Sequence, residues 1–407
     1  MRLRLIPHDV LPETRLLLWG RGLRAFGDGF VSLLLPFYLT LLGFSPSAVG
    51  GLIAATLAGS ATLTLTVGFT AHRFGQRGLL VAATLLMIGT GIGFTLETQF
   101  WPLLAIGFLG TLNPSSGDVS VFLPLEQAML AETVSDRSRT AVFAVYSLVG
   151  SLVAAAGSLA AGAPDLLSRA LPMSLATALQ AMFALYALLG LATYYLYRRL
   201  PLRLDHRGDG KRQALGPSRG IVFTLAALFS LDAFGGGFIV QSLLALWLFD
   251  RFGLSLAAAG SFFFWSGVLS AGSYLAAARI ARKIGLVNTM VFTHLPSNIL
   301  LILAPFAPSL WLALALLLAR SALSQMDVPT RTSYVMAVVT PGERAAAAGV
   351  TAVPRSLAAA ASPLAAGYLL GLSAFGWPLV AAGALKGIYD VLLLLLFRHR
   401  RPPEEQE

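Results

Sequence analysis

The sequence of 407 residues contains no cysteine, and only 12% of its residues are charged. The absence of cysteine excludes a disulfide framework and a thiolate metal site. A soluble globular domain carries charge on about a quarter of its residues, so this chain has roughly half the usual share. With 56% hydrophobic residues and a mean hydropathy of +0.75, the composition excludes an ordinary soluble domain and indicates a membrane protein.

Motifs of common enzymes and of nucleotide-driven pumps are also missing. The sequence has no HExxH zinc motif and no GxxxxGK[ST] phosphate-binding loop. Because a cysteine nucleophile is excluded as well, we expect neither an enzyme nor a bound cofactor or metal.

Twelve apolar runs in the sequence are long enough to cross a membrane. A hydrocarbon core of about 30 Å needs about 20 helical residues. Because lipid offers no partner to backbone N–H and C=O groups, each run is expected to form a helix. The sequence therefore predicts an all-α polytopic membrane protein, with spans near residues 16–42, 46–71, 77–97, 101–131, 139–163, 172–197, 220–250, 254–281, 286–305, 308–338, 343–370 and 373–397.

Basic residues indicate how the chain is oriented. Lys and Arg are concentrated at the two termini and in every second connection, above all in residues 198–219. By the positive-inside rule we expect both termini to be cytoplasmic, in a multi-pass protein of the cell (inner) membrane. The net charge of +10 then reflects contact with anionic lipid rather than binding of nucleic acid. Residues 198–219 are interpreted as a cytoplasmic linker between an N-terminal half (1–197) and a C-terminal half (220–407).

The two halves share short patterns in the same order, which indicates an internal duplication. A Gly-x-Gly pattern within an apolar run is interpreted as a place where helices or a substrate approach the backbone closely. The matching pairs are AFGDGF (25–30) with AFGGGF (233–238), GFS (43–45) with GLS (253–255), AHRFGQR (71–77) with ARKIGLV (281–287), and, more loosely, PLEQAML (124–130) with PTRTSYV (329–335).

The stretch GFTAHRFGQRG, residues 68–78, resembles the loop signature of the major facilitator superfamily. Gly68, Arg73, Gly75 and Arg77 match that signature, whereas His72 stands where the family usually has Asp. With the two related sets of spans and the basic linker, the chain resembles this superfamily over nearly its whole length. The resemblance implies two six-helix halves related by a pseudo-twofold axis, around a central cavity that opens alternately to each side.

Charged residues inside the spans are the candidates for function. A central charge costs about 2.5 to 3.5 kcal/mol on insertion scales, while net stabilities are only about 5 to 15 kcal/mol. Most of these charges must therefore be paired, hydrated or neutral. The basic ones are Arg21, Arg24, Arg320, Arg331, Arg355 and Lys386, and the acidic ones are Asp28, Asp118, Glu126, Asp232, Asp327 and Asp390.

Asp28 lies near the middle of the first span, one helical turn after Arg24. It is either half of a permanent ion pair with Arg24 or a carboxyl group that binds and releases a proton as the cavity changes its exposure. The second interpretation resembles the acidic residue in the first span of proton-coupled drug exporters. Asp232 holds the position that Arg24 has in the first half, and we expect Arg24 or Arg355 opposite it.

The fourth and tenth spans supply a second set of candidates. Asp118 follows Asn113-Pro114, where the helix is expected to kink and to free carbonyl groups for a ligand. Glu126 and Arg331 hold corresponding positions nearer the cytoplasm, where a gating salt bridge and substrate contact are both open, and Asp327 is assigned to the same gate.

Three further residues of the C-terminal half have expected roles. Arg355 is the candidate for contact with an anionic substrate or for a partner of an acid. Lys386 and Asp390 are interpreted as a structural i, i+4 pair. His294 is interpreted as a hydrogen-bonded core residue.

Proton-driven export of a small drug-like or metabolite substrate by a monomer is the function that these features favour. Gly150, Gly157 and Gly162 resemble the glycine-rich antiporter helix of exporters but lack its Gly-Pro step. The alternative is uptake or exchange of an organic or inorganic anion, which the basic residues in the spans favour.

Overall fold

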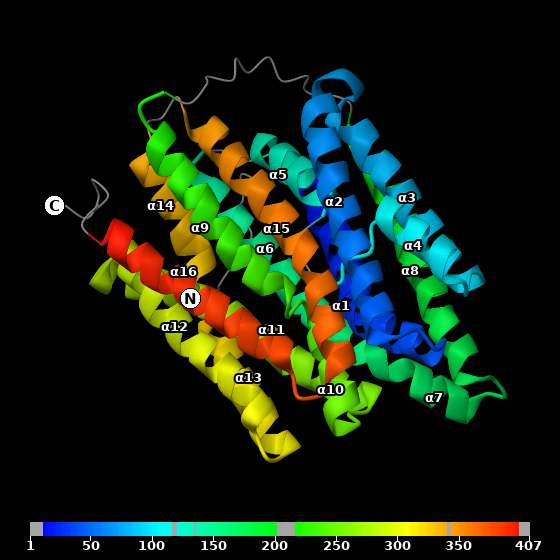
Figure 1. Ribbon diagram of the computed structural model, residues 1–407. Helices are drawn as coiled ribbons and strands as arrows, with labels where there is room; N and C mark the ends of the chain where they lie inside the picture. Colours follow the sequence, from blue (N-terminus) through cyan, green and yellow to red (C-terminus); the bar gives the residue numbers. More distant parts are fainter. Residues whose placement is uncertain (1–10, 116–119, 134–135, 202–215, 340–342, 399–407) are drawn as a thin grey trace, which may run out of the picture. The chain divides into compact units, whose positions relative to one another are not determined.

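The computed structural model describes residues 11–115, 120–133, 136–201, 216–339 and 343–398. In these residues every regular element is a helix, which confirms the predicted all-α class (Figure 1). The helices are α1 (Pro12–Leu41), α2 (Pro46–Phe74), α3 (Gln76–Leu96), α4 (Phe100–Leu109), α5 (Phe122–Glu132), α6 (Asp136–Leu159), η1 (Ala160–Gly162), α7 (Ala163–Ala170), α8 (Leu175–Arg198), α9 (Arg219–Gly237), α10 (Gln241–Phe252), α11 (Leu256–Ile284), α12 (Leu286–Leu303), η3 (Ala304–Phe306), α13 (Leu310–Leu323), α14 (Asp327–Val338), α15 (Arg344–Leu372) and α16 (Trp377–Phe397).

Eight helical segments of the described residues are long and apolar enough to cross a membrane. Two further helices, α4 and α13, are apolar but shorter. The chain is therefore a multi-pass membrane protein, and the count of twelve spans stays a prediction.

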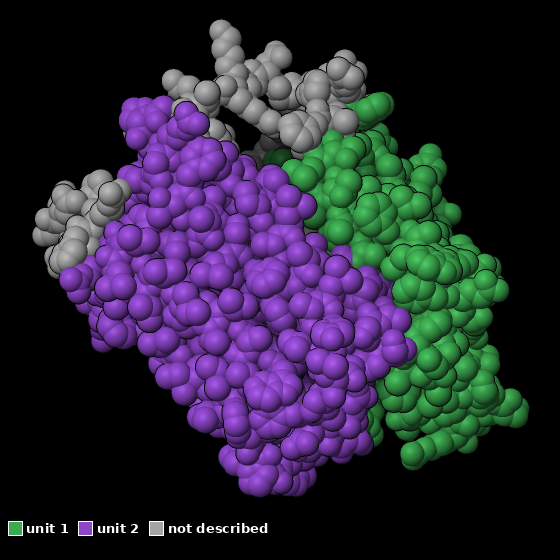
Figure 2. All heavy atoms as spheres, viewed as in Figure 1, with its two compact units in different colours: residues 1–44, 55–209, 254–264 green, residues 45–54, 210–253, 265–407 purple. Residues whose placement is uncertain are grey.

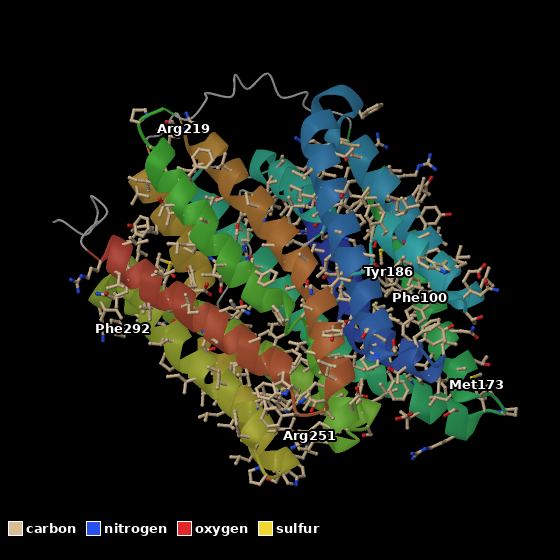
Figure 3. The ribbon with its side chains drawn as sticks, in the orientation of Figure 1. Phe100, Met173, Tyr186, Arg219, Arg251 and Phe292 are labelled. Carbon is tan, nitrogen blue, oxygen red and sulfur yellow. The ribbon has the colours of Figure 1, made fainter. Side chains whose placement is uncertain are left out.

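The helix is broken where a kink at Asn113-Pro114 is predicted, because α4 ends at Leu109 and the described residues 110–115 are not helical. Side chains bind part of the backbone in this gap. The hydroxyl of Tyr186 on α8, a residue labelled in Figure 3, donates to the carbonyl oxygen of Thr111 at 3.0 Å. The Asn113 side chain accepts from the backbone N–H of Ser115 at 3.1 Å. A non-helical segment at membrane depth is tolerated when protein groups satisfy its polar atoms.

Glycines in left-handed backbone conformations confirm the duplication at two matched places. Gly43 and Gly253 follow α1 and α10 with φ of +86° and +60°. Gly75 and Gly285 precede α3 and α12 with φ of +73° and +86°. Side chains with a Cβ atom are disfavoured at such angles, so the same turn requires glycine in both copies.

The chain divides into two compact units, coloured separately in Figure 2. Unit 1 consists of residues 1–44, 55–209 and 254–264, and unit 2 of residues 45–54, 210–253 and 265–407. Two of the boundaries between the units, at residues 54/55 and 264/265, fall inside α2 and α11. The predicted division at residues 197 and 220 stays a prediction.

Close helix packing explains the repeated small residues. A Cβ atom at Gly29 of α1 would collide with the carbonyl oxygen of Ala154 on α6, and one at Gly157 would collide with that of Phe26. In unit 2, a Cβ atom at Gly237 would collide with the side chain of Ser362 on α15. Gly29 and Gly237 are equivalent in the repeat, so both copies use this glycine for packing of the same kind.

Candidate functional site

Unit 1 contains a buried ion pair between Arg24 of α1 and Glu126 of α5. Arg24 is 2% exposed and Glu126 is fully buried, and the Arg24 Nη2 donates to Glu126 Oε2. The Tyr146 hydroxyl donates to the same oxygen at 2.5 Å, and the Tyr197 hydroxyl donates to Oε1. The Phe122 ring, one turn before Glu126, lies 4.0 Å from the Arg24 guanidinium carbon. Three donors and a cation–π contact thus compensate the buried charges.

Glycines of unit 1 make room for these side chains. A Cβ atom at Gly20 would collide with the Tyr197 ring, and one at Gly150 would collide with the guanidinium of Arg21. Arg21 is buried, its guanidinium carbon lies 5.3 Å from the centre of the Tyr146 ring, and its Nε and Nη1 have no hydrogen-bond partner in the described residues. In unit 1 the Nη2 of Arg24 is therefore paired with a carboxylate, while Nε and Nη1 of Arg21 have no partner among the described residues.

Asp28, the candidate for proton coupling, is buried with 4% of its surface exposed. No basic nitrogen of the described residues lies within 4 Å of its carboxylate, because Arg24 is bound to Glu126 instead. Its polar surroundings are Arg24, Arg21 and the side chain of Asn113 in the gap between α4 and α5. The permanent ion pair between Arg24 and Asp28 is therefore not present.

Unit 2 contains a second buried charge cluster, centred on Asp232 of α9. Lys386 Nζ donates to Asp232 Oδ1 at 2.6 Å, and Arg331 Nη1 donates to Oδ2 at 3.0 Å. The second nitrogen of Arg331, Nη2, donates to Asp327 Oδ2 at 2.8 Å. All four side chains are at least nine-tenths buried. The expectation that Arg24 or Arg355 lies opposite Asp232 is wrong, because Lys386 and Arg331 hold that place.

The cluster continues to His294 of α12 and Asp390 of α16. His294 Nδ1 lies 2.8 Å from Asp390 Oδ1, and Asn298 Nδ2 donates to Asp390 Oδ2 at 2.8 Å. Lys386 therefore pairs with Asp232 and not with Asp390, so the predicted i, i+4 pair is wrong. The prediction of a hydrogen-bonded, buried His294 is confirmed.

The two clusters carry the same ion pair with its charges exchanged. Arg24 and Glu126 in unit 1 correspond by the repeat to Asp232 and Arg331 in unit 2, and each position pairs with its own partner. Asp28 corresponds to Gly236, which has the Lys386 Cε and Nζ within 3.8 Å of a Cβ built there. Gly236 therefore places no side chain beside the Lys386 ammonium group.

The other predicted site residues lie on other helices or outside the described part. Arg355 is partly buried on α15. Gly75 precedes α3, and Arg77 Nη2 donates to the carbonyl oxygen of Arg198 at 2.7 Å. Asp118 and the side chains at Gly68, His72 and Arg73 lie outside the described residues.

Sequence reasoning missed Tyr146 and Tyr197 as ligands of Glu126. Buried tyrosines look like core residues in a sequence, so no local signal distinguishes them. Within the residues that the structure describes, no group of three or more His, Asp or Glu side chains is placed to hold a metal ion.

Comparisons with known proteins agree with this architecture. An uncharacterized membrane protein of Saccharomyces cerevisiae, YJR124C, is 26% identical over 419 residues, covering 94% of this chain and 93% of that protein.

Two solved structures share the fold. The human organic anion transporter MFSD10 (TETRAN) is 20% identical with a TM-score of 0.66, covering 94% of this chain and 100% of the other. A bacterial homologue of the human lysosomal transporter Spinster is 16% identical with a TM-score of 0.72, covering 95% and 96%. The family model of the Major Facilitator Superfamily matches residues 17–319, and the chain belongs to that superfamily of membrane transporters.

Proposed function

We propose that this transporter exports a small drug-like or metabolite substrate in exchange for protons. The observation that carries the proposal is Asp28, a buried carboxyl group in α1 with no basic nitrogen of the described residues within 4 Å. In lipid a charge of this kind costs about 2.5 to 3.5 kcal/mol when it is uncompensated. Exposure to water removes that cost, so a change of access during transport would release or bind a proton at Asp28.

Arg24 and Arg21 moderate this cost without removing it. Both guanidinium groups act on Asp28 at longer range, so the carboxylate form stays accessible when water reaches the site. Arg24 is held by Glu126, which prevents it from moving to neutralise Asp28 permanently. A carboxyl group that is poorly compensated and can exchange its proton suits a coupling role better than a structural one.

The remaining assignments complete the proposal. Arg355 contacts the substrate, and Glu126, Asp327 and Arg331 belong to gates that rearrange as each side opens. Asp118 contributes to the same path. Both termini face the cytoplasm of the cell membrane, because the basic residues gather in the linker and at the termini. The protein is proposed to act as a monomer.

Dissipation of an imposed pH gradient in proteoliposomes tests the coupling. The panel consists of lipophilic cations, neutral drugs and organic anions, each added to the native chain, Asp28→Asn and Asp250→Asn. Asp250 is the matched control, because it is an exposed acid at the end of α10. We expect at least one compound to collapse the gradient with the native chain and the control, but not with Asp28→Asn. Equal collapse in all three would refute proton coupling at Asp28.

Transport of an organic anion is the second candidate. Arg21 favours it, because two nitrogens of this buried guanidinium have no partner in the described residues and could bind a carboxylate. The fold is also shared with a protein named as an organic anion transporter. In this case labelled anions would exchange without proton movement, and Arg21→Gln or Arg355→Ala would abolish that exchange while Asp28→Asn would not.

A further inference from the structure

His294 stands between two carboxylates, one on each side of its ring. Nδ1 lies 2.8 Å from Asp390 Oδ1, and Nε2 lies 3.9 Å from Asp232 Oδ1. The ring is buried with 3% of the residue exposed, and Asp390 is fully buried. An imidazole in this position has a proton acceptor on both sides, while a neutral imidazole has only one N–H to donate.

Asn298 lies on the Nδ1 side of the ring, with its Nδ2 3.3 Å from His294 Nδ1. Its Nδ2 lies one turn from His294 on α12 and donates to Asp390 Oδ2 at 2.8 Å, so it anchors the carboxylate that faces Nδ1. With the single N–H on Nδ1, Asp390 receives two donors. The Nε2 lone pair then faces the Asp232 carboxylate, a contact that offers no hydrogen bond.

Helices α9, α13, α14 and α16 bring charged or titratable groups to the cluster that contains His294. From α9 comes Asp232, and from α14 come Asp327 and Arg331. Helix α16 brings Asp390, Lys386 and Tyr389. The Tyr389 hydroxyl has no hydrogen-bond partner among the described residues, and its ring centre lies 6.1 Å from that of His294. Arg320 of α13 acts on Asp232 from more than 4 Å. The contacts within 4 Å join three carboxylates, those of Asp232, Asp327 and Asp390, and two cations, Lys386 and Arg331. One added proton balances this set.

We propose that His294 is a proton-binding site of unit 2, and that its protonation transfers Asp232 Oδ1 from Lys386 to His294. A proton from water would bind Nε2 and convert the 3.9 Å contact into a charge-assisted hydrogen bond. Lys386 already occupies the same oxygen at 2.6 Å. Two cations on one carboxylate oxygen repel each other, so the new bond would weaken the contact with Lys386.

The exchange of partners connects proton binding to movement between helices. Lys386 connects α16 to α9, whereas a protonated His294 would connect α12 to α9. Arg331 keeps Asp232 Oδ2 in both states, so the carboxylate remains anchored to α14. The role of this proton in transport rests on the proposed function, but its binding does not.

Nuclear magnetic resonance of the histidine ring tests the proposal without a substrate. The chain is labelled with ¹⁵N-histidine in lipid nanodiscs, with His8, His72, His206 and His399 replaced by Gln. We expect the signals of the His294 ring nitrogens to change from those of a neutral ring to those of a protonated ring as the pH is lowered. The Lys386 ammonium signal, identified with Lys386→Met, should shift over the same pH range. If the variant with all four replacements fails to fold, the difference between the spectra of the native chain and of His294→Gln identifies the same signals.

Three outcomes decide the matter. Titration of both signals, displaced by Asp232→Asn but not by Asp250→Asn, supports the site and the exchange. A ring in one protonation state across the whole range overturns the proton site. A titrating ring with an unchanged Lys386 signal overturns the exchange of partners. None of these results depends on Asp28, so they separate this inference from the proteoliposome assay of coupling.

Discussion

Replacing Glu126 by Gln should destabilise the protein strongly, because it leaves Arg24 as a buried charge without its counter-ion. Arg24 is 2% exposed, and the Glu126 carboxylate supplies its ion pair. Removing one partner of a buried pair costs about 3 to 5 kcal/mol. Net stabilities are about 5 to 15 kcal/mol, so this single change would remove a large part of the total. The amide keeps the shape of the carboxylate, which limits the effect to charge.

A double-mutant cycle measures this effect directly. Arg24→Met removes the other charge, and the combined variant buries neither, so it should be more stable than either single variant. We expect a coupling free energy of at least about 2 kcal/mol, within the range seen for residues in direct contact. The assay is unfolding in mixed micelles with increasing dodecyl sulfate, followed by tryptophan fluorescence. Glu97→Gln is the control, since Glu97 is only partly buried and has no ion pair in the described residues.

Additive losses in this cycle would refute the reasoning. They would mean that Arg24 and Glu126 do not depend on each other, and that Tyr146 and Tyr197 alone hold Glu126 in place. A decrease in the free energy of unfolding below about 1 kcal/mol for Glu126→Gln would also contradict the reasoning. The pair would then contribute no more than an exposed ion pair, which contributes about 0 to 1 kcal/mol.

Two glycine substitutions test the packing and the turns. Gly29→Ala should lower the unfolding midpoint, because the new Cβ atom would collide with the carbonyl oxygen of Ala154, whereas Gly89→Ala, with no atom within 4 Å, should not. An unchanged midpoint for Gly29→Ala would contradict close packing of α1 on α6. Gly285→Ala should cost about 1 to 2 kcal/mol, because its φ of +86° is left-handed. Gly272→Ala on α11 has open space and should cost less, so equal losses would contradict this explanation.

The duplication could be recognised in the sequence because its strongest matches are backbone requirements. Gly43 and Gly253, and likewise Gly75 and Gly285, occupy left-handed positions that few other residues tolerate. Such a constraint is visible in the sequence because the same residue type, glycine, recurs at equivalent positions. The exchanged ion pairs could not be recognised in this way, because the equivalent positions 24 and 232 hold different residue types of opposite charge, Arg24 and Asp232.

Local spacing was a poor guide to which charges pair. Lys386 and Asp390 are one turn apart on α16, and Arg24 and Asp28 are one turn apart on α1, yet neither pair forms an ion pair within 4 Å. In each case a residue from another helix offers a better-placed partner. A pair on one helix gains only about 0.2 to 0.5 kcal/mol, so contacts between helices decide the outcome.

The sequence by itself determined that the chain is an all-α membrane protein and a member of the Major Facilitator Superfamily. The hydropathy of a span depends only on its consecutive residues, and a spanning segment must satisfy its backbone groups internally. These properties can therefore be predicted without knowing which helices pack together. Only the tertiary structure decided that Arg24 binds Glu126, and that Asp232, Lys386, His294 and Asp390 form one cluster. Those partners are far apart in sequence, and the rotation of each helix about its axis determines which side chains meet.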